Sequence, residues 1–247
     1  YIALSSQADL VPGGNADGSR EVYAYDTRRG RVLQVTESSG DSAFAAFGPR
    51  PHRIAVHSRQ DLVPGGNTDG SQEVYVANLR NRRMQQLTAS FGSSHLGAFA
   101  PRRRWAAVVS DGDLTPGAPG NTDRTEELYL VRIGVRRRQP VQATDGDQHV
   151  FFVGFDPRGR FAGVDTRADL VRGRNVDGSR EAFVVRVARR PRITQLTASD
   201  ADSEVGAFLP DGRRVVLHSR GDLDRDGPGN ADGSAEVFVA DLPRPRR

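Results

Sequence analysis

The sequence predicts an all-β protein, a β-propeller of four-stranded antiparallel blades, and three observations lead there. One loop motif returns five times in 247 residues, at spacings of 52, 54, 54 and 55 residues. A fixed period of about 40–50 residues is typical of propeller blades, each of which buries its apolar faces against its neighbours. Each period also holds four short runs of β-branched and aromatic residues, and helical periodicity is nowhere sustained.

The second unit shows the four predicted strands most clearly, and we name them a to d. Strand a covers about Ala43 to Phe47 and ends at a Gly-Pro turn, and strand b covers His52 to Ser58. Strand c covers Glu73 to Asn78 and strand d covers Met84 to Thr88. Turn-forming residues bound each run, as expected for an antiparallel meander.

Two short motifs carry the same pattern through the chain. Strand a ends in Phe-x-Pro or a close variant at Phe99-Ala100-Pro101, Phe155-Asp156-Pro157 and Phe208-Leu209-Pro210. Strand d ends in Gln-x-Thr at Gln34-Val35-Thr36, Gln86-Leu87-Thr88, Gln142-Ala143-Thr144 and Gln195-Leu196-Thr197. We therefore expect a single propeller domain over 1–247, with blade units of about 1–36, 37–88, 89–144, 145–197 and 198–247.

The strand count leaves the ring open to two interpretations. The chain opens in strand b at Tyr1 to Leu4 and closes after strand c at Val237 to Val239, so one a strand and one d strand are missing from five units. Either five blades close with two three-stranded members, or the segment is part of a six-bladed or larger ring. We favour five blades, because an unpaired edge strand promotes aggregation.

Composition narrows the class of protein further. Hydrophobic residues make up 36% and charged residues 27%, and mean hydropathy is −0.55, which predicts a soluble chain. No run approaches the roughly 18 apolar residues of a membrane span, and there is no cysteine for disulfides or thiol chemistry. No signal-peptide pattern stands at Tyr1, but the chain begins in mid-repeat, so this excludes nothing.

The recurring loop between strands b and c supplies hard oxygen atoms. Its motif is Asn-x-Asp followed by a Glu, with a glycine between them in four of the five copies. Calcium takes six to eight oxygen ligands in flexible geometry, including backbone carbonyls such as the one near Ser19. The predicted calcium ligands are Asn15, Asp17, Glu21, Asn67, Asp69, Glu73, Asn121, Asp123, Glu127, Asn175, Asp177, Glu181, Asn230, Asp232 and Glu236.

Turn chemistry alone is the competing interpretation of this loop. Asn and Asp side chains bond to their own backbone in Asx turns, and glycine serves any turn with positive φ. A second carboxylate within seven residues in every copy favours a cation, because two uncompensated carboxylates that converge repel each other. No His or Cys stands among the repeated residues, which favours calcium over transition metals.

Two copies of the loop differ from the rest. The third unit has Arg124 where the others have glycine, so we expect its site to be the weakest. The fifth unit adds Asp222, Asp224 and Asp226 before Gly227, which matches the start of an EF-hand loop. Its twelfth position is Gly233 and not Glu, so this additional predicted calcium site lacks the usual closing ligand.

The repeat resembles the long form of the TolB-type, WD-like β-propeller repeat. The string Ser-x-x-Asp-Leu-Val-Pro-Gly-Gly-Asn-x-Asp-Gly-Ser-x-Glu-Val-Tyr, from Ser6 to Tyr23 and again from Ser58 to Tyr75, carries the resemblance over nearly the whole chain. The loop also resembles the calcium loops of integrin-type propellers. The TolB-type family ranges from periplasmic partner-binding proteins to propellers attached to peptidases, so the resemblance implies an extracytoplasmic binding or scaffold protein by analogy.

The arginines give the predicted disc one basic face. All 35 cationic residues are arginine, and the net charge is only +4 with a pI of about 10.0. In a meander the a–b and c–d turns emerge on one face, and most arginines fall in these turns, for example Arg28, Arg29 and Arg31. Such a face is suited to polyanions through counterion release. The plainer interpretation is a solvated surface in a chain that uses arginine where others use lysine.

An enzyme is the alternative function. Counting back from the strand-a phenylalanine places Asp41, Ser93, His149 and Asp202 where the inner strands begin, with His95 and Glu204 two residues further in. Such residues around a channel mouth could bind a metal or act as acid and base in a lactonase, lyase or hydrolase. His57 and His218, with Asp165 in the matching place, end strand b and are expected to cap strand ends.

These observations favour a non-enzymatic, calcium-stabilised propeller that binds a protein partner or acts as a scaffold outside the cytoplasm. At about 10⁻⁴ M affinity and millimolar calcium, each loop would add about 1.4 kcal/mol of stability. The metal would then be structural, because it orders long loops.

Overall fold

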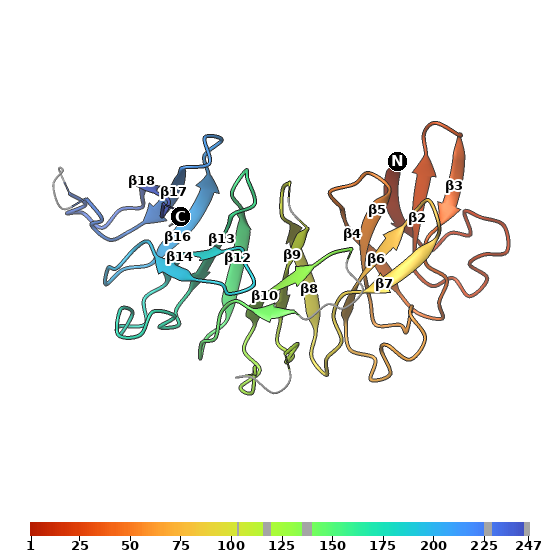
Figure 1. Ribbon diagram of the computed structural model, residues 1–247, viewed down its shortest axis with the longest axis horizontal. Helices are drawn as coiled ribbons and strands as arrows, with labels where there is room; N and C mark the ends of the chain where they lie inside the picture. The colour runs from red at the N-terminus through yellow and green to blue at the C-terminus, as the bar shows by residue number, and fades with distance from the viewer. Residues whose placement is uncertain (103, 116–119, 135–139, 225–228, 245–247) are drawn as a thin grey trace. The chain divides into compact units, whose positions relative to one another are not determined.

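The computed structural model describes residues 1–102, 104–115, 120–134, 140–224 and 229–244 (Figure 1). Within these residues the secondary structure consists of strands alone, and the 18 strands form five antiparallel sheets. The prediction of an all-β chain is confirmed. Five sheets also agree with the five predicted blades, and each sheet lies inside one predicted blade unit.

The sheets follow the chain in order. The first contains β1 (Ile2–Ser6), β2 (Glu21–Asp26) and β3 (Arg31–Gln34). The second contains β4 (Ser42–Phe47), β5 (Arg53–Ser58), β6 (Glu73–Asn78) and β7 (Arg83–Gln86). The third contains β8 (Ser94–Phe99), β9 (Trp105–Ser110), β10 (Glu127–Arg132) and β11 (Val141–Gln142). The fourth contains β12 (Val150–Phe155), β13 (Phe161–Thr166), β14 (Glu181–Arg186) and β15 (Ile193–Gln195). The fifth contains β16 (Ser203–Phe208), β17 (Arg214–Ser219) and β18 (Glu236–Asp241).

The chain divides into two compact units. Unit 1 comprises residues 1–96 with 112–114, and unit 2 comprises residues 97–111 with 115–247. The prediction that 1–247 is a single domain stays a prediction.

In unit 1 the core lies between the first two sheets. Strand c of both blades in this unit begins Glu-Val-Tyr, and in β6 the run from Glu73 to Ala77 is buried throughout. Side chains alternate between the faces of a strand, so burial of every position means that both faces of the sheet are covered. Val22 of β2 packs in one cluster with Val56 of β5 and Tyr75 of β6.

In unit 2 two further core layers fill the spaces between successive sheets. Leu128 and Leu130 of β10 cluster with Val164 of β13 and Phe183 of β14, which joins the third and fourth sheets. A second cluster joins the fourth and fifth sheets. The third and fourth sheets approach each other closely at Gly97, where a Cβ atom would lie 2.5 Å from the Phe152 ring. Sheets stacked face to face through interlocking side chains are the expected packing of propeller blades.

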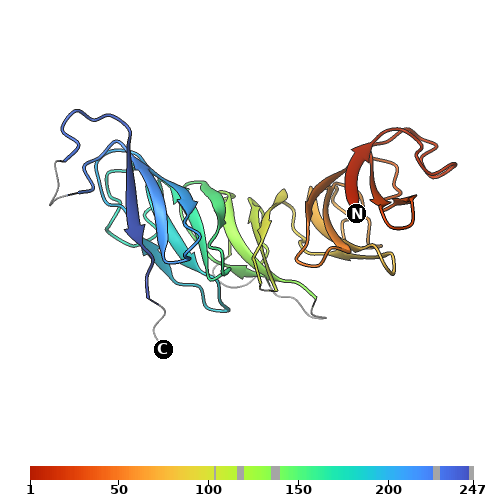
Figure 2. The same cartoon turned by 90° about the horizontal axis from the view of Figure 1, so that it is seen from above.

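The fifth sheet ends in an exposed strand. Figure 2 shows β16, β17 and β18, in blue, side by side at the end of the chain. β18 occupies the strand-c position, yet Val237 is 66% and Val239 56% exposed, whereas the matching Val74 and Val76 of β6 are buried. The difference follows from packing between sheets. At the matching positions, Leu128 and Leu130 of β10 pack against the fourth sheet, and Ala182 and Val184 of β14 pack against the fifth. Among the described residues no further sheet follows β18 along the chain.

Two findings bear on the membrane and on cross-links. Within the described ranges, none of the elements is a helix long and apolar enough to span a bilayer. The sequence contains no cysteine, so it forms no disulfides.

Candidate functional site

The repeated loop between strands b and c folds the same way in each sheet. In the fourth sheet the Asp177 Oδ1 atom accepts a hydrogen bond from the Ser179 backbone N–H at 3.0 Å, which is an Asx turn. The Asn175 amide donates to the carbonyls of Arg167 (3.1 Å) and Ser179 (2.9 Å). The same bonds recur around Asp17, Asp69, Asp123 and Asp232. The backbone carbonyl predicted as a calcium ligand therefore accepts the asparagine amide.

The loop glutamate is a buried clamp between two loops of its own blade. Glu21, Glu73, Glu127 and Glu181 are each only 1% exposed. The Glu181 Oε1 atom accepts the Ser199 backbone N–H at 2.9 Å, and Glu73 accepts the Ser90 N–H at 2.9 Å. Thr144 donates its hydroxyl to Glu127 and accepts the Leu128 N–H at 2.8 Å. This explains why strand d is followed by threonine in each repeat.

Each loop also gathers several oxygen acceptors around one hydroxyl. Ser179 Oγ lies 3.4 Å from Asn175 Oδ1, 2.9 Å from Asp177 Oδ1, 3.1 Å from Glu181 Oε1 and 2.8 Å from the Ser199 carbonyl oxygen. A hydroxyl has one proton to donate, so it satisfies one of these four acceptors at a time. Ser71 makes the same short approaches to an aspartate, a glutamate and a carbonyl. We call this arrangement the loop oxygen cluster.

Burial raises the pKa of the clamp carboxyl groups. It raises the pKa of Glu73 and Glu181, and it raises that of Glu127 to about 7. Desolvation is the main cause in all three, since removal from water disfavours the charged form. The Asp177 carboxyl is exposed, and its bonds to Ser179 hold its pKa below the usual value. The Ser179 hydroxyl thus lies between two carboxyl groups whose pKa values are shifted in opposite directions, Asp177 downwards and Glu181 upwards.

The atypical loops keep the backbone but change its surroundings. Arg124 adopts φ of 62°, close to the 71° of Gly18, Gly70 and Gly178, so the third loop has the turn without the glycine that favours it. In the fifth loop Asn230, Asp232 and Glu236 make their bonds at the surface, and Glu236 is exposed. Asp222 and Asp224 are both exposed, and Asp226 lies outside the described residues.

One repeated aspartate was missed by the sequence prediction. Asp9 accepts hydrogen bonds from the N–H groups of Gly13 (2.7 Å), Gly14 (3.2 Å) and Asn15 (3.2 Å), and Asp61 and Asp169 do the same in their loops. The Asp-Leu pair that recurs at positions 9, 61, 113, 169 and 222 is the signal that could have revealed it. Asp222 stands at the fifth copy of the pair, and its Oδ1 atom accepts the Asp224 N–H at 3.3 Å.

The predicted channel-mouth residues of unit 2 tie adjacent sheets together. Asp202 accepts the Arg180 backbone N–H at 2.8 Å and forms an ion pair with Arg167 at 2.7 Å. Glu204 pairs with the Arg180 guanidinium at 2.5 Å. His149 Nδ1 accepts the Glu126 N–H at 3.0 Å. These side chains link the start of one inner strand to the end of the preceding b–c loop.

Unit 1 contains the remaining channel-mouth residues in similar roles. Asp41 accepts the Arg20 N–H at 2.8 Å, and His95 Nδ1 lies 2.9 Å from Gln72 Nε2. Since the two units are described separately, convergence of all five residues on one opening stays a prediction. Over the described part of the chain, no group of three or more His, Asp or Glu side chains forms a metal-binding constellation.

The residues at the end of strand b secure a bulge in the next sheet. β4 and β16 shift register near Phe44 and Val205. At a bulge one backbone group is left outside the ladder. The Val205 N–H donates to Asp165 Oδ1 at 2.7 Å, and the Phe44 N–H donates to Ser5 Oγ at 2.8 Å. His57 makes the matching bond to the third sheet, since its Nε2 atom accepts the Leu96 N–H at 2.9 Å.

Two of the side chains that accept these bonds, His57 and Asp165, have displaced pKa values. Burial lowers the pKa of His57 to about 4, with His95 nearby as a second cause. Burial raises the pKa of Asp165 to about 7, and the Glu204 carboxylate adds to that rise. His218, the last residue of the series, is exposed. These residues were predicted to cap the ends of their own strands. His57 and Asp165 instead accept hydrogen bonds from the following sheet.

An amphipathic patch lies on the inner strands of unit 2. Phe151 of β12 is 49% and Val153 39% exposed. The Arg180 guanidinium carbon lies 4.9 Å from the centre of the Phe151 ring, a cation–π contact. With Asp202 and Glu204, these residues form what we call the inner-strand patch.

The comparisons with known proteins identify the class but not a family. No family model and no curated protein matches the chain. Several solved structures do match, and all those named here are less than 25% identical, so they show the fold alone. With the five antiparallel sheets, they define the chain as a β-propeller protein.

Four of these structures describe the range. A prolyl endopeptidase structure matches at TM-score 0.53 and 18% identity, over 97% of this chain and 31% of that one. The β-propeller domain of the trilobed protease from Pyrococcus furiosus matches at 0.51 and 9%, over 90% and 61%. An oligogalacturonate lyase in complex with manganese matches at 0.50 and 12%, over 91% and 54%. The putative TolB from Agrobacterium tumefaciens matches at 0.48 and 14%, over 98% and 70%.

The predicted β-propeller is confirmed at the level of fold. The chain spans about a third to 70% of the length of these proteins. A lyase and peptidases occur among them beside the putative TolB, so the fold alone does not decide between an enzyme and a binding protein.

Proposed function

We propose that this chain is a non-enzymatic propeller that binds a protein partner through the inner-strand patch and acts outside the cytoplasm. The proposal rests on one observation: the channel-mouth side chains are already engaged in hydrogen bonds and ion pairs between sheets. A general base or nucleophile must reach the substrate, whereas Asp202, Glu204 and His149 each bond to a neighbouring sheet or loop. Their bonds serve the scaffold.

The patch has the composition of a protein-binding surface. Aromatic residues and arginine are enriched where protein interfaces bury their central contacts. Phe151 is half exposed under the Arg180 guanidinium, and Arg180 forms an ion pair with Glu204. A partner that covers the Phe151 ring would bury apolar surface, and the nearby ion pairs would fix the orientation of that partner.

We expect Phe151→Ser to weaken the binding of peptides that recognise the inner-strand patch. Peptides would be selected from a displayed random library on the wild-type chain and then measured against the variant. A loss of about 2 kcal/mol, or about 30-fold in Kd, is typical of a central aromatic contact. The matched control is Phe91→Ser, since Phe91 is 89% exposed and lies in unit 1.

Two outcomes would contradict this proposal. Equal weakening by the Phe91 control would show that binding needs only exposed apolar area. Turnover of oligogalacturonate or of a peptide substrate that is lost in His149→Ala, at unchanged melting temperature, would favour the enzyme alternative.

We also propose that calcium stabilises the repeated loops. The loop oxygen cluster supports this, because four oxygen acceptors face the single proton of Ser179. Asn67 Oδ1, Asn121 Oδ1 and Asn230 Oδ1 are buried without a hydrogen-bond partner within the described residues. Asparagine, aspartate and glutamate oxygens with a hydroxyl and a carbonyl match the donor set of calcium. Turn chemistry alone is the alternative.

We expect calcium, and not magnesium, to raise the melting temperature above its value in chelator. Asp177→Asn should remove about one loop's share, on the order of 1 kcal/mol at millimolar calcium. Asparagine still accepts the Ser179 N–H, so a pure Asx turn would survive the change. Asp147→Asn, at an exposed loop position, is the matched control. No calcium-dependent rise in the wild type would leave turn chemistry as the explanation.

A further inference from the structure

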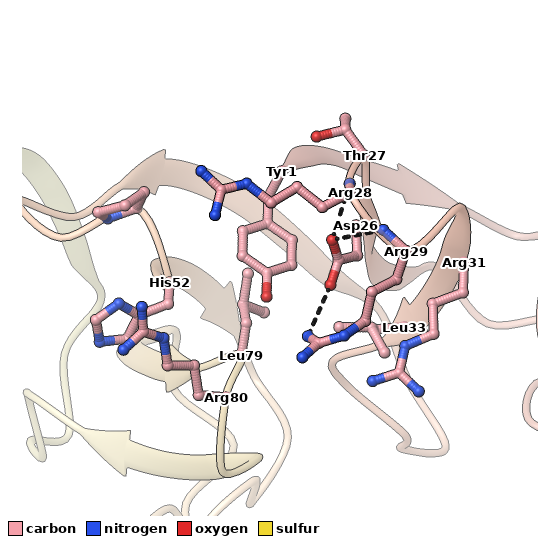
Figure 3. Close-up of a pocket in the computed structure, with 11 residues that line it drawn as sticks. Tyr1, Asp26, Thr27, Arg28, Arg29, Arg31, Leu33, His52, Leu79 and Arg80 are labelled. Carbon is pink, nitrogen blue, oxygen red and sulfur yellow. Dashed lines mark hydrogen bonds and ion pairs between the residues drawn. The ribbon is translucent and has the colours of Figure 1, made fainter.

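Unit 1 contains a pocket of about 660 Å³ formed by three turns of the first two blades. The β2–β3 turn supplies Asp26 to Arg29 and Arg31, the β4–β5 turn supplies Pro51 and His52, and the β6–β7 turn supplies Leu79 and Arg80. Figure 3 shows the Tyr1 ring between the His52–Arg80 side and the Asp26–Arg29 side. Ligand pockets are commonly of this size.

The charges in this pocket are unbalanced. Arg28, Arg29, Arg31 and Arg80 line it, and Asp26 is its one acidic residue. Asp26 is already paired with Arg29 at 3.2 Å and accepts the Arg28 and Arg29 N–H groups. Among the residues that the structure describes, Arg28, Arg31 and Arg80 have no ion-pair partner. Three guanidinium groups therefore lack a carboxylate.

The position of His52 also indicates that the pocket has a positive electrostatic potential. Its Nδ1 atom is buried and has no hydrogen-bond partner in the described part of the chain. Burial lowers the pKa of His52, and the nearby guanidinium groups of Arg80, Arg53 and Arg50 lower it further. The ring is thus neutral at pH 7, and the charge of the pocket comes from arginine.

The remaining lining is apolar. Leu33 and Leu79 are each 7% exposed and belong to the floor, and the Tyr1 ring stands beside them. A guanidinium binds phosphate oxygens in a two-pronged fashion, and an aromatic ring stacks on a flat apolar group. The lining thus suits a molecule with one anionic end and one flat apolar end.

We propose that this pocket binds a phosphate-type oxyanion carried on a flat apolar group. Arg80 and Arg28 bind the oxyanion, and Tyr1 with Leu79 contacts the apolar body. A second pocket of about 560 Å³ in unit 2, lined by Arg158, Arg160, Arg213 and Arg244, lies at turns of the last two blades, and its lining includes no aromatic ring. The site is separate from the inner-strand patch, so its failure leaves the proposed partner binding untouched.

The test is calorimetric titration of the full chain with phenyl phosphate, inorganic phosphate and phenyl sulfate at two salt concentrations. Phenyl phosphate is expected to bind at least several-fold more tightly than inorganic phosphate. Arg80→Gln should weaken it about ten-fold, and Arg80→Lys should restore part of the loss because the charge remains without the fork. Tyr1→Ala should remove the preference for the phenyl compound.

The matched control is Arg189→Gln, which removes an exposed arginine from a turn of unit 2. It should leave the affinity unchanged. Equal weakening by both substitutions would replace the pocket with diffuse attraction to an arginine-rich surface. Absence of binding by all three compounds, with the melting temperature of Arg80→Gln unchanged, would overturn the proposal outright.

Discussion

Replacing Asp156 with alanine is expected to lower the free energy of unfolding by about 3 kcal/mol, a large effect for one side chain. Asp156 lies in the turn between β12 and β13 and is fully buried. Its carboxylate accepts the Phe161 N–H at 2.8 Å, the Arg158 N–H at 3.3 Å and the Arg160 Nε–H at 3.2 Å, and it also accepts the Arg160 backbone N–H.

The effect is large because several groups lose their partner together. Alanine leaves the backbone N–H groups of Phe161, Arg158 and Arg160 and the Arg160 Nε–H without this acceptor. An unpaired buried donor costs about 1–3 kcal/mol. Arg160 also donates to the Gly212 carbonyl of the next blade, so its position depends on Asp156 and affects the contact between the fourth and fifth sheets. The loss of a buried charge pair belongs to the most destabilising class of substitution.

The control is the same turn of the fifth sheet. Asp211 accepts the Arg213 N–H at 2.7 Å and pairs with Arg214 at 2.8 Å, but its side chain is 35% exposed. Water can replace those bonds, so Asp211→Ala should cost less than about 1 kcal/mol. Trp105 is the single tryptophan and lies in the core of unit 2, so its fluorescence in a urea titration reports both variants. Equal losses would show that burial is not the cause.

The sequence predicted the strands well because their signals are local. Strand a of the second unit was expected at Ala43 to Phe47 and is Ser42–Phe47. Strand d was expected to run to Thr88, whereas β7 ends at Gln86. The difference has a physical reason, since the Thr88 hydroxyl accepts the Val74 N–H at 2.9 Å and thereby leaves the strand ladder.

The bonds between sheets could not be predicted in the same way. Asp156 has Gly48, Ala100 and Leu209 at the matching repeat positions, so no repeated pattern pointed to it. Asp165 was expected to cap its own strand end, because the bulge at Val205 that requires an acceptor lies 40 residues away in the sequence. The side chains of the b–c loops were predicted as a set, but the hydroxyl of Ser179 at their centre was not. Such contacts depend on packing between blades.

The second large effect concerns pH and Asp165. Burial raises the pKa of this carboxyl to about 7, mainly through desolvation. Glu204 raises it further, and Arg180 opposes the rise. The folded chain therefore binds a proton at this position at pH values where the unfolded chain, with an ordinary pKa near 4, has lost it. The stability that Asp165 contributes is therefore fully present below about pH 4 and is lost as the pH rises through about 7.

We expect Asp165→Asn to remove this loss and to make the chain more stable than the wild type near pH 7.5, by on the order of 3 kcal/mol. The asparagine carbonyl keeps the bond from the Val205 N–H and carries no charge at any pH. The measurement is the free energy of unfolding from urea titrations between pH 4 and 8. The difference between the two proteins reports the titration at this site, since the carboxyl groups away from Asp165 are the same in both.

Asp147→Asn provides the matched control, because it removes the same charge at an exposed position. Its stability difference from the wild type should stay flat across the pH range. If Asp165→Asn shows the same flat difference, the carboxyl is ionised in the folded state, and the Arg180 guanidinium outweighs burial. The wild-type decline with pH would then have another source, and the bulge at Val205 would be held by a charged and not a neutral acceptor.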